Sequence, residues 1–214
     1  LLHHAIYVDW KAGNTHADTV RRVLEKSADI NGKASYIREN DKVNYLEPMH
    51  IAAGFGHVPS MRALVEKVAE PVELLNKYCR LDQEDFYAPI HDAAYNGRKE
   101  AVVWLLENRA DASLKNRDGY SPLHWLAKKG FEPEGDLEVM VKALLKHKAR
   151  LDMRTKKEQK IPLELAAADD SGFPRRLVHL LAPSFQAGER GGYSFFDDMC
   201  VLSSLNMAAA NQLA

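Results

Sequence analysis

A short phrase recurs along this chain, and its recurrence constrains the fold more than any other feature. The phrase reads EPMHIAAGFGH from Glu47, APIHDAAYNGR from Ala88 and SPLHWLAKKGF from Ser121. A shorter form, LHHA, begins at Leu2, and IPLELAAADDSG begins at Ile161 with glutamate in the histidine slot. The slot recurs after 47, 41, 33 and 40 residues. Such recurrence indicates a repeat architecture rather than a single active site.

A second phrase follows each copy of the first. Its apolar residues stand at the i, i+3 and i+4 spacing, which marks one buried face of a helix. The apolar pairs are Val23-Leu24, Leu64-Val65, Leu105-Leu106, Leu144-Leu145 and Leu180-Leu181. Each unit is therefore expected to hold two helices. Because proline fits the first helical turn, the first helices are expected to start at Pro48, Pro89, Pro122 and Pro162. Glycine turns a chain cheaply, so these helices should end at Gly56, Gly97, Gly130 and Gly172.

Together the two phrases resemble the ankyrin repeat, whose pattern is T-P-L-H-x-A-A-x-x-G-H followed by V-x-x-L-L-x-x-G-A. The resemblance implies an all-α solenoid of helix-turn-helix units with hairpin loops and a C-terminal helical tail. An ankyrin repeat domain is expected over residues 1–183, with a linker and an uncharged tail over residues 184–214. The expected repeats span about 1–36, 44–80, 86–117, 118–157 and 158–183. Because no unit can bury its own apolar face, the stack itself makes the core.

The histidines of the phrase could be mistaken for a metal site or a catalytic set. His3, His50, His91 and His124 lie in different repeats and are not spaced as ligands. The family resemblance implies that each bonds to neighbouring backbone. Glu164 takes the slot in the last unit, and threonine is absent from the complete phrases. These losses predict weaker bonds between repeats and thermal unfolding that starts at low temperature or in more than one step.

The chain departs from the regular period in several places. The first and second hairpin connections each carry eight extra residues relative to the connection from Ala110 to Ser121. The second is expected to hold a short helix starting at Pro71, with Val72, Leu75 and Cys79 on one face. About six further residues separate the two helices of the first and fourth units, near 7–15 and 132–140. Those two turns are interpreted as tolerated surface variation, because loop length costs little; binding fingers are the alternative.

The tail has an unusual composition. No residue from Met199 to Ala214 is charged, and four apolar residues share a helical face with Ala209: Met199, Leu202, Leu205 and Leu213. An uncharged helix is expected to be covered. It could cap the last repeat, dock on a partner, or lie at a membrane surface, which its lack of Lys and Arg disfavours. The first two alternatives stay open.

Composition and motifs argue against catalysis and against several classes of ligand. The chain has 29 basic and 30 acidic residues, so its net charge of −1 indicates no nucleic-acid partner. No phosphate-binding loop, nucleophile elbow or metal-ligand motif is present, and the sequence predicts no enzyme, cofactor, metal or small-molecule substrate. No apolar run is long enough to cross a membrane. Seven basic residues between Lys146 and Lys160 are interpreted as a solvated face, with an acidic protein surface as the alternative.

The resemblance implies protein–protein recognition through the exposed positions of the inner helices and the hairpin tips. Those positions are Ile51, Phe55, Asp92, Tyr95, Asn96, Arg117, Tyr120, Trp125, Lys128 and Lys129. One alternative is a fixed structural subunit of a large assembly, anchored by the insertions and the tail. Another is the targeting domain of a longer enzyme. We expect an intracellular, cytoplasmic location, with an organelle as the alternative because the chain starts without Met and reads as cropped or processed.

Overall fold

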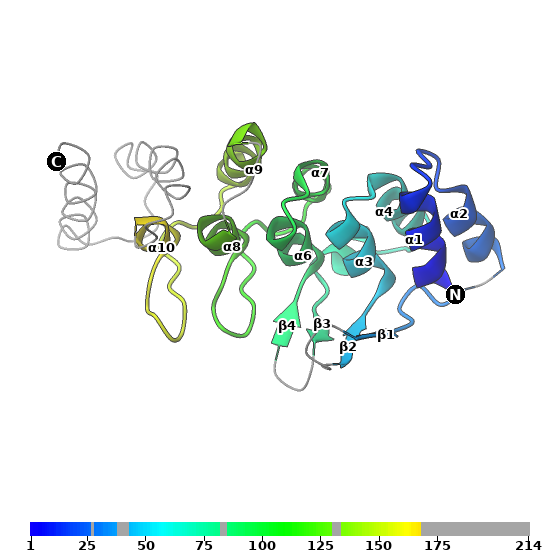
Figure 1. The fold of residues 1–214 in the computed structure, drawn as a ribbon, viewed down its shortest axis with the longest axis horizontal. Helices are drawn as coiled ribbons and strands as arrows, with labels where there is room; N and C mark the ends of the chain where they lie inside the picture. Colours follow the sequence, from blue (N-terminus) through cyan, green and yellow to red (C-terminus); the bar gives the residue numbers. More distant parts are fainter. Residues whose placement is uncertain (27, 38–42, 82–84, 130–133, 168–214) are drawn as a thin grey trace.

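Helix pairs stand side by side in a row along the chain (Figure 1). The computed structural model describes residues 1–26, 28–37, 43–81, 85–129 and 134–167. The inner helices are α1 (Leu2–Lys11), α3 (Pro48–Phe55), α6 (Pro89–Tyr95), α8 (Pro122–Lys129) and α10 (Pro162–Ala167). The outer helices are α2 (Asp18–Glu25), α4 (Val58–Val65), α7 (Lys99–Glu107) and α9 (Glu134–Lys146). The predicted all-α solenoid of helix pairs is confirmed.

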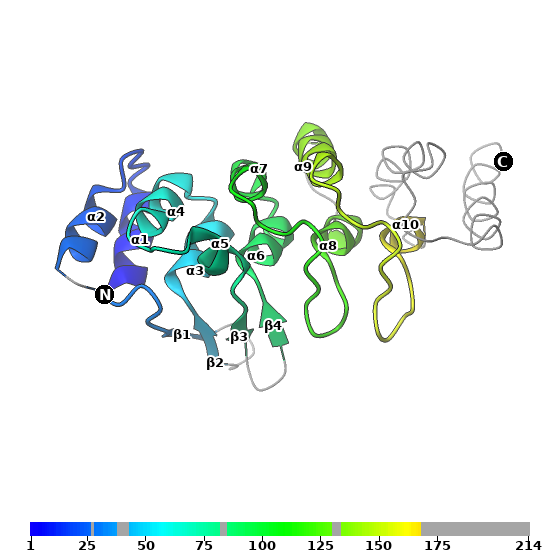
Figure 2. The same cartoon turned by 180° about the vertical axis from the view of Figure 1, so that it is seen from behind.

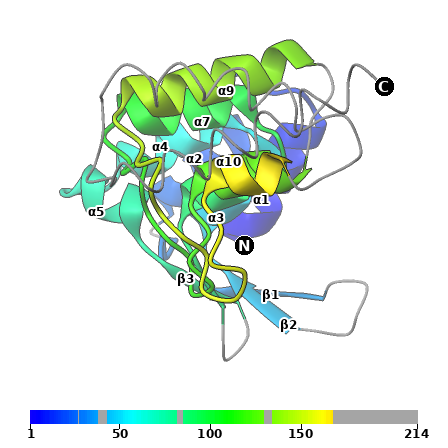
Figure 3. The ribbon, with the colours of Figure 1, turned by 90° about the vertical axis from the view of Figure 1, so that its left-hand side faces the viewer.

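The helices form two layers with the hairpin loops on one side. Each inner helix contacts the next inner helix, and each outer helix contacts the next outer helix. Figure 3 shows this end-on, with the outer layer above the inner layer and the hairpins projecting below. This arrangement leaves one flank of each inner helix beside the hairpins rather than under another helix.

Local signals set both ends of α3 and the start of α6 as predicted, whereas α6 ends at Tyr95, two residues before Gly97. Pro48 and Pro89 stand at the first turn of α3 and α6, preceded by Glu47 and Ala88 in extended conformation. Gly56 ends α3 with φ of 77°, a left-handed conformation that glycine adopts without a steric penalty. Gly130 and Gly172 lie outside the described residues.

The core runs continuously through the stack. Ile6, Met49, Ile90 and Leu123 from the inner helices are all fully buried. They pack in one cluster with buried outer-helix residues, namely Met61, Leu64, Leu105, Leu106, Met140 and Leu144. Because each repeat buries its apolar face only against its neighbours, the stack is stabilised as a whole.

The first two hairpin loops pair as short strands that the sequence did not predict. Strands β1 (Ala34–Ile37) and β2 (Val43–Leu46) are antiparallel, with Ser35 opposite Tyr45. Strands β3 (Cys79–Leu81) and β4 (Asp85–Tyr87) are also antiparallel, and Asn44 of β2 pairs with Leu81 of β3. The sheet order is β1-β2-β3-β4. When two lengthened hairpins lie side by side, their backbone N–H and C=O groups can pair through hydrogen bonds that join both loops in one sheet.

The insertions differ in part from their predictions. A short helix, α5 (Pro71–Asn76), does start at Pro71 (Figure 2). The predicted face was wrong, because the helix ends at Asn76: Cys79 lies in β3 and Val72 is exposed, while Leu74 and Leu75 are buried.

The other two insertions lengthen helices. α1 runs through Tyr7 to Lys11 and has 10 residues, against 8 in α3. α9 has 13 residues, against 9 in α7. The prediction of longer turns at 7–15 and 132–140 is therefore wrong for the residues that lie within α1 and α9. These residues extend the helices, because each residue added to a formed helix gains a hydrogen bond.

Candidate functional site

The histidines of the repeated phrase join each repeat to the next hairpin. Every one donates its Nε2 hydrogen to a backbone carbonyl: His3 to Leu46 (2.8 Å), His50 to Tyr87 (3.0 Å), His91 to Leu114 (2.9 Å) and His124 to Lys160 (3.2 Å). Nδ1 of His91 accepts from the backbone N–H of Ala88, and Nδ1 of His124 accepts from that of Ser121, both at 3.0 Å. An imidazole that accepts at Nδ1 and donates at Nε2 is neutral. The predicted backbone-bonding role is confirmed.

Burial keeps these rings neutral. Desolvation lowers the pKa of His50, His91 and His124 to about 4 in each case, although hydrogen bonds to backbone carbonyls oppose the shift. Across the part of the chain that the structure describes, no cluster of His, Cys, Asp and Glu could hold a metal ion. The contacts of these histidines are therefore contacts within the stack.

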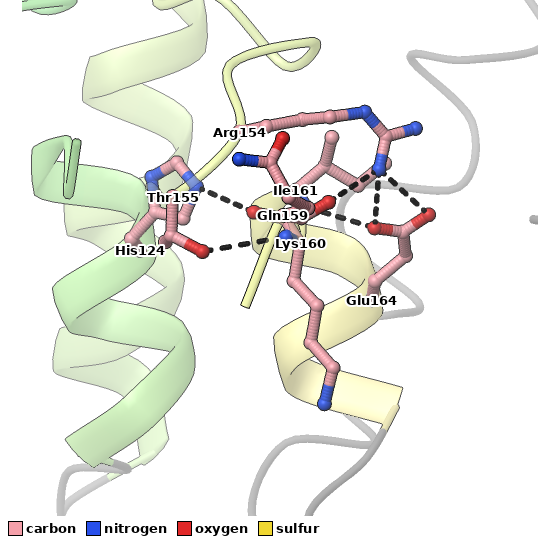
Figure 4. Close-up of polar contacts among 7 residues, drawn as sticks. All are labelled: His124, Arg154, Thr155, Gln159, Lys160, Ile161 and Glu164. Atoms are coloured by element: carbon pink, nitrogen blue, oxygen red, sulfur yellow. Dashed lines mark hydrogen bonds and ion pairs between the residues drawn. The ribbon is translucent and has the colours of Figure 1, made fainter. Parts of the chain in front are cut away.

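Glu164 keeps half of the histidine's role in the fifth repeat (Figure 4). Its Oε2 accepts the backbone N–H of Ile161 at 2.9 Å, as the histidine Nδ1 does elsewhere. Arg154, from the hairpin before α10, donates to Oε2 at 3.0 Å and to the Gln159 carbonyl at 2.6 Å. The charge of the Glu164 carboxylate is thus paired with an arginine of the preceding hairpin.

Trp125 and three tyrosine rings lie together on the inner-helix face. Tyr95 meets Trp125 edge-on with centroids 5.2 Å apart, Tyr120 stacks on it at 5.0 Å, and Tyr87 lies at 6.1 Å. These rings come from α6, α8, β4 and the hairpin before α8. Trp125 and Tyr95 are half-buried, whereas Tyr120 is buried. Aromatic pairs at such distances fix one another's orientation.

Two lysines lie against this aromatic cluster. The ammonium of Lys129 sits 4.0 Å from the centre of the Tyr95 ring, and that of Lys128 lies 5.0 Å from Tyr120 and 6.0 Å from Trp125. Both lysines are exposed at the end of α8. Cation–π attraction holds the charges over the rings. The result is a surface that combines apolar area with positive charge, here called the Trp125 cluster: Tyr87, Tyr95, Tyr120, Trp125, Lys128 and Lys129.

A second aromatic group, the Trp10 cluster, joins the first two repeats. It consists of Tyr7, Trp10, Lys11 and Phe55. Trp10 stacks on Phe55 with centroids 4.5 Å apart, Tyr7 lies 6.1 Å from Phe55, and the Lys11 ammonium is 5.7 Å from the Tyr7 ring. Tyr7 and Trp10 are 39% and 37% exposed, which is unusual for side chains of this size.

The sequence prediction missed Tyr7 and Trp10 as surface residues. Their i, i+3 spacing would have placed them on one face of an extended first helix, had 7–15 been interpreted as helix.

The other predicted partner-binding residues are spread over the same face. Ile51 and Asp92 are half-buried, and Asn96 is exposed. Arg117 is exposed on the hairpin before α8. Phe55 belongs to the Trp10 cluster and Tyr95 to the Trp125 cluster, so these two predicted residues lie in separate aromatic groups. The predicted tail-docking residues Met199, Leu202, Leu205 and Leu213 lie outside the described residues.

The basic run from 146 to 160 is partly neutralised. Arg150 pairs with Asp152 through Nη2 and Oδ2 at 2.7 Å, and Arg154 pairs with Glu164. Lys146, Lys148, Lys156 and Lys157 are exposed. This pairing favours the interpretation as a solvated face.

The fold defines a repeat protein built of stacked helix pairs. A family model described as ankyrin repeats (3 copies) matches residues 2–116 and 90–186. The chain belongs to the ankyrin repeat family.

Relatives of this chain carry the same repeat in their names. A Fowlpox virus (strain NVSL) protein named as an ankyrin repeat protein, FPV031, is 29% identical over 157 residues, which is 71% of this chain and 40% of that protein. The mouse ankyrin repeat and SAM domain-containing protein 6 is 34% identical over 77 residues, and its rat counterpart 35% over 74, in each case 35% of this chain and 8% of the relative. The chain thus spans less than half the length of these relatives. Among the described residues, no helix is long and apolar enough to cross a membrane.

Proposed function

We propose that this chain is a non-enzymatic module that binds a partner protein through the surface of its inner helices and hairpins. Ankyrin repeats generally mediate protein–protein interaction, and the proposal assigns that role to particular residues here. The observation that carries it is the Trp125 cluster, where Trp125 and Tyr95 remain half-exposed and two lysines lie over aromatic rings. Trp and Tyr dominate the binding energy of protein interfaces.

The geometry favours binding by pre-formed side chains. The contacts of Trp125 with Tyr95 and Tyr120 restrict its ring before any partner arrives, so little rotamer entropy is lost on binding. Lys128 and Lys129 are held near the same rings and would steer an acidic partner. A surface of this kind recognises a partner by shape and charge and performs no chemistry.

The experiment that tests this proposal is quantitative affinity capture with the full chain and with Tyr95→Ala and Lys129→Ala variants. Both changes remove contact groups from the surface. Val139→Ala on α9 is the matched control, because Val139 is 43% exposed on an outer helix. The amount of a partner captured through the inner face should fall about tenfold with either variant and should stay unchanged with the control. Unchanged capture by both variants, with helicity retained in circular dichroism, would place binding on another surface.

A further inference from the structure

Two Asn-Gly pairs occur in this chain, and they stand in similar sequence surroundings. Asn31-Gly32 lies in the segment INGK, and Asn96-Gly97 lies in the segment YNGR, so each pair follows a large apolar residue and precedes a basic one. Asparagine before glycine is especially prone to deamidation, because glycine has no side chain to hinder its backbone nitrogen from attacking the asparagine amide. A difference between the two sites in the folded chain should therefore come from their structural surroundings.

The two pairs are also alike in exposure and in the bond that the glycine nitrogen makes. Asn31 is exposed in the turn before β1, and Asn96 is exposed at the C-terminal end of α6. Each glycine N–H donates to the carbonyl three residues earlier, at 3.3 Å for Gly32 and 3.2 Å for Gly97. Both bonds are long, so the nitrogen of neither glycine is held much more firmly than the other.

The two side-chain amides differ, because among the described residues only the oxygen of Asn31 accepts from a cation. Lys77, directly after α5, donates from its ammonium to Asn31 Oδ1 at 2.9 Å. Asn96 Oδ1 accepts no hydrogen bond from the described part of the chain, and its Nδ2 donates to the Asp92 carbonyl at 2.8 Å. An ammonium at an amide oxygen polarises the carbonyl and stabilises the oxyanion that forms when a nucleophile adds. Asn31 therefore has the activated amide of the two.

Lys77 is itself held in place by a second partner. Its Nζ lies 3.1 Å from Oε2 of Glu47, whose side chain is only 3% exposed. A charge-assisted contact with a carboxylate is strong, so it restricts where the ammonium can move. Lys77 is thus placed at the Asn31 amide before any reaction begins, which is the condition under which a charge stabilises an oxyanion most effectively.

We propose that Asn31 is a self-modification site, which deamidates faster than Asn96 in the folded chain. The backbone nitrogen of Gly32 attacks Cγ of Asn31, and the Lys77 ammonium stabilises the oxyanion that results. The proton of the Gly32 N–H passes to the amide nitrogen, which leaves as ammonia, and a cyclic succinimide remains. Water then opens the succinimide at either carbonyl and gives aspartate or isoaspartate, so water is the one reactant consumed.

The product places a new charge where an ion pair already exists. The carboxylate formed at position 31 lies beside Lys77 and competes with Glu47 for the ammonium. Isoaspartate also lengthens the backbone of the turn that leads into β1 by a methylene group. The reaction therefore gives the first hairpin an irreversible change of charge and chain length, which accumulates with the age of the molecule.

The test follows both sites in the full wild-type chain during incubation at neutral pH. Peptide mass spectrometry measures deamidation at Asn31 and Asn96 in the same sample, so each sample carries its own reference. In the folded chain Asn31 should react about tenfold faster than Asn96, a smaller effect than in a buried site because Asn31 is exposed. In urea the two rates should become similar, because the structural difference is gone. Equal rates in the folded chain, or a ratio that urea leaves unchanged, would overturn the inference.

Variants of Lys77 separate its effect from that of the turn. Lys77→Met should slow the reaction at Asn31 about tenfold and leave Asn96 unchanged, whereas Lys77→Arg keeps a cationic donor and should retain most of the wild-type rate. Lys33→Met is the matched control, because it removes an exposed positive charge next to Gly32 in the sequence. If Lys77→Met slows Asn31 no more than Lys33→Met does, the inference fails. Circular dichroism shows whether each variant is folded, and the wild-type comparison decides if Lys77→Met is not.

Discussion

Mild acid should destabilise this protein through the three buried histidines that join its repeats. The pKa of His50, His91 and His124 is lowered from 6.5 to about 4 by burial. Because the pKa of these rings is lower in the folded chain than in the unfolded chain, the unfolded chain takes up protons first as pH falls. The stability is therefore fully present above pH 6.5 and is lost as pH falls toward 4. Lowering the pH from about 7.5 to about 5.5 should therefore cost about 4 kcal/mol of stability over the three rings together.

The assay is equilibrium urea unfolding followed by circular dichroism at the two pH values. The His124→Gln variant should be less stable at neutral pH, because the bonds of this residue to Ser121 and Lys160 are altered. The difference between its free energies of unfolding at the two pH values should be about a third smaller than in the wild type. His16→Gln, which changes an exposed histidine, is the matched control and should keep the full difference. A wild-type difference below about 1 kcal/mol, or one that His124→Gln leaves intact, would refute the reasoning.

Two further predictions concern the hairpins. Gly119→Ala should lower the free energy of unfolding by about 2 kcal/mol in urea titration, because Gly119 has φ of 84° and a Cβ would lie 3.0 Å from the Arg154 carbonyl. Gly13 has φ of 64°, and a Cβ built on it would meet no atom within 4 Å, so Gly13→Ala should lower the free energy of unfolding by about half as much. Equal losses in the two variants would contradict the steric argument. In a Cys200→Ser background, Cys79 should react with a thiol reagent only on unfolding, since it is buried and burial raises its pKa to about 11. Rapid labelling of the native protein would show that Cys79 is accessible.

Features that depend on neighbours in sequence were predictable, whereas features that depend on neighbouring repeats were not. Pro48 and Gly56 mark the ends of α3 by local backbone chemistry alone, and both predictions are confirmed. The strands arise because the first two hairpins stand side by side, which no single segment encodes. Extra residues near 7–15 could extend a turn or a helix; in the structure α1 continues to Lys11, and Trp10 near its end stacks on Phe55 of the next inner helix.

The candidate surface shows the same division. Lys128 and Lys129 were predicted as exposed from their place in the repeat, and they are. Tyr120 was predicted at a hairpin tip available to a partner, but it is only 8% exposed because it stacks on Trp125 of the following helix. Whether a side chain on this face meets solvent or a neighbouring ring depends on the identity of the side chains around it, which the repeat pattern leaves variable.

The substitution at Glu164 follows from what the histidine slot must do. A neutral imidazole accepts the N–H at the start of its own helix and donates to a carbonyl of the next hairpin. A carboxylate is an acceptor only, so Glu164 keeps the first bond, with Ile161, and cannot make the second. Arg154, from the hairpin that precedes α10, pairs with the charge that the substitution introduces. The loss at this slot is therefore confined to the second bond, which the histidines of the other repeats donate to a backbone carbonyl.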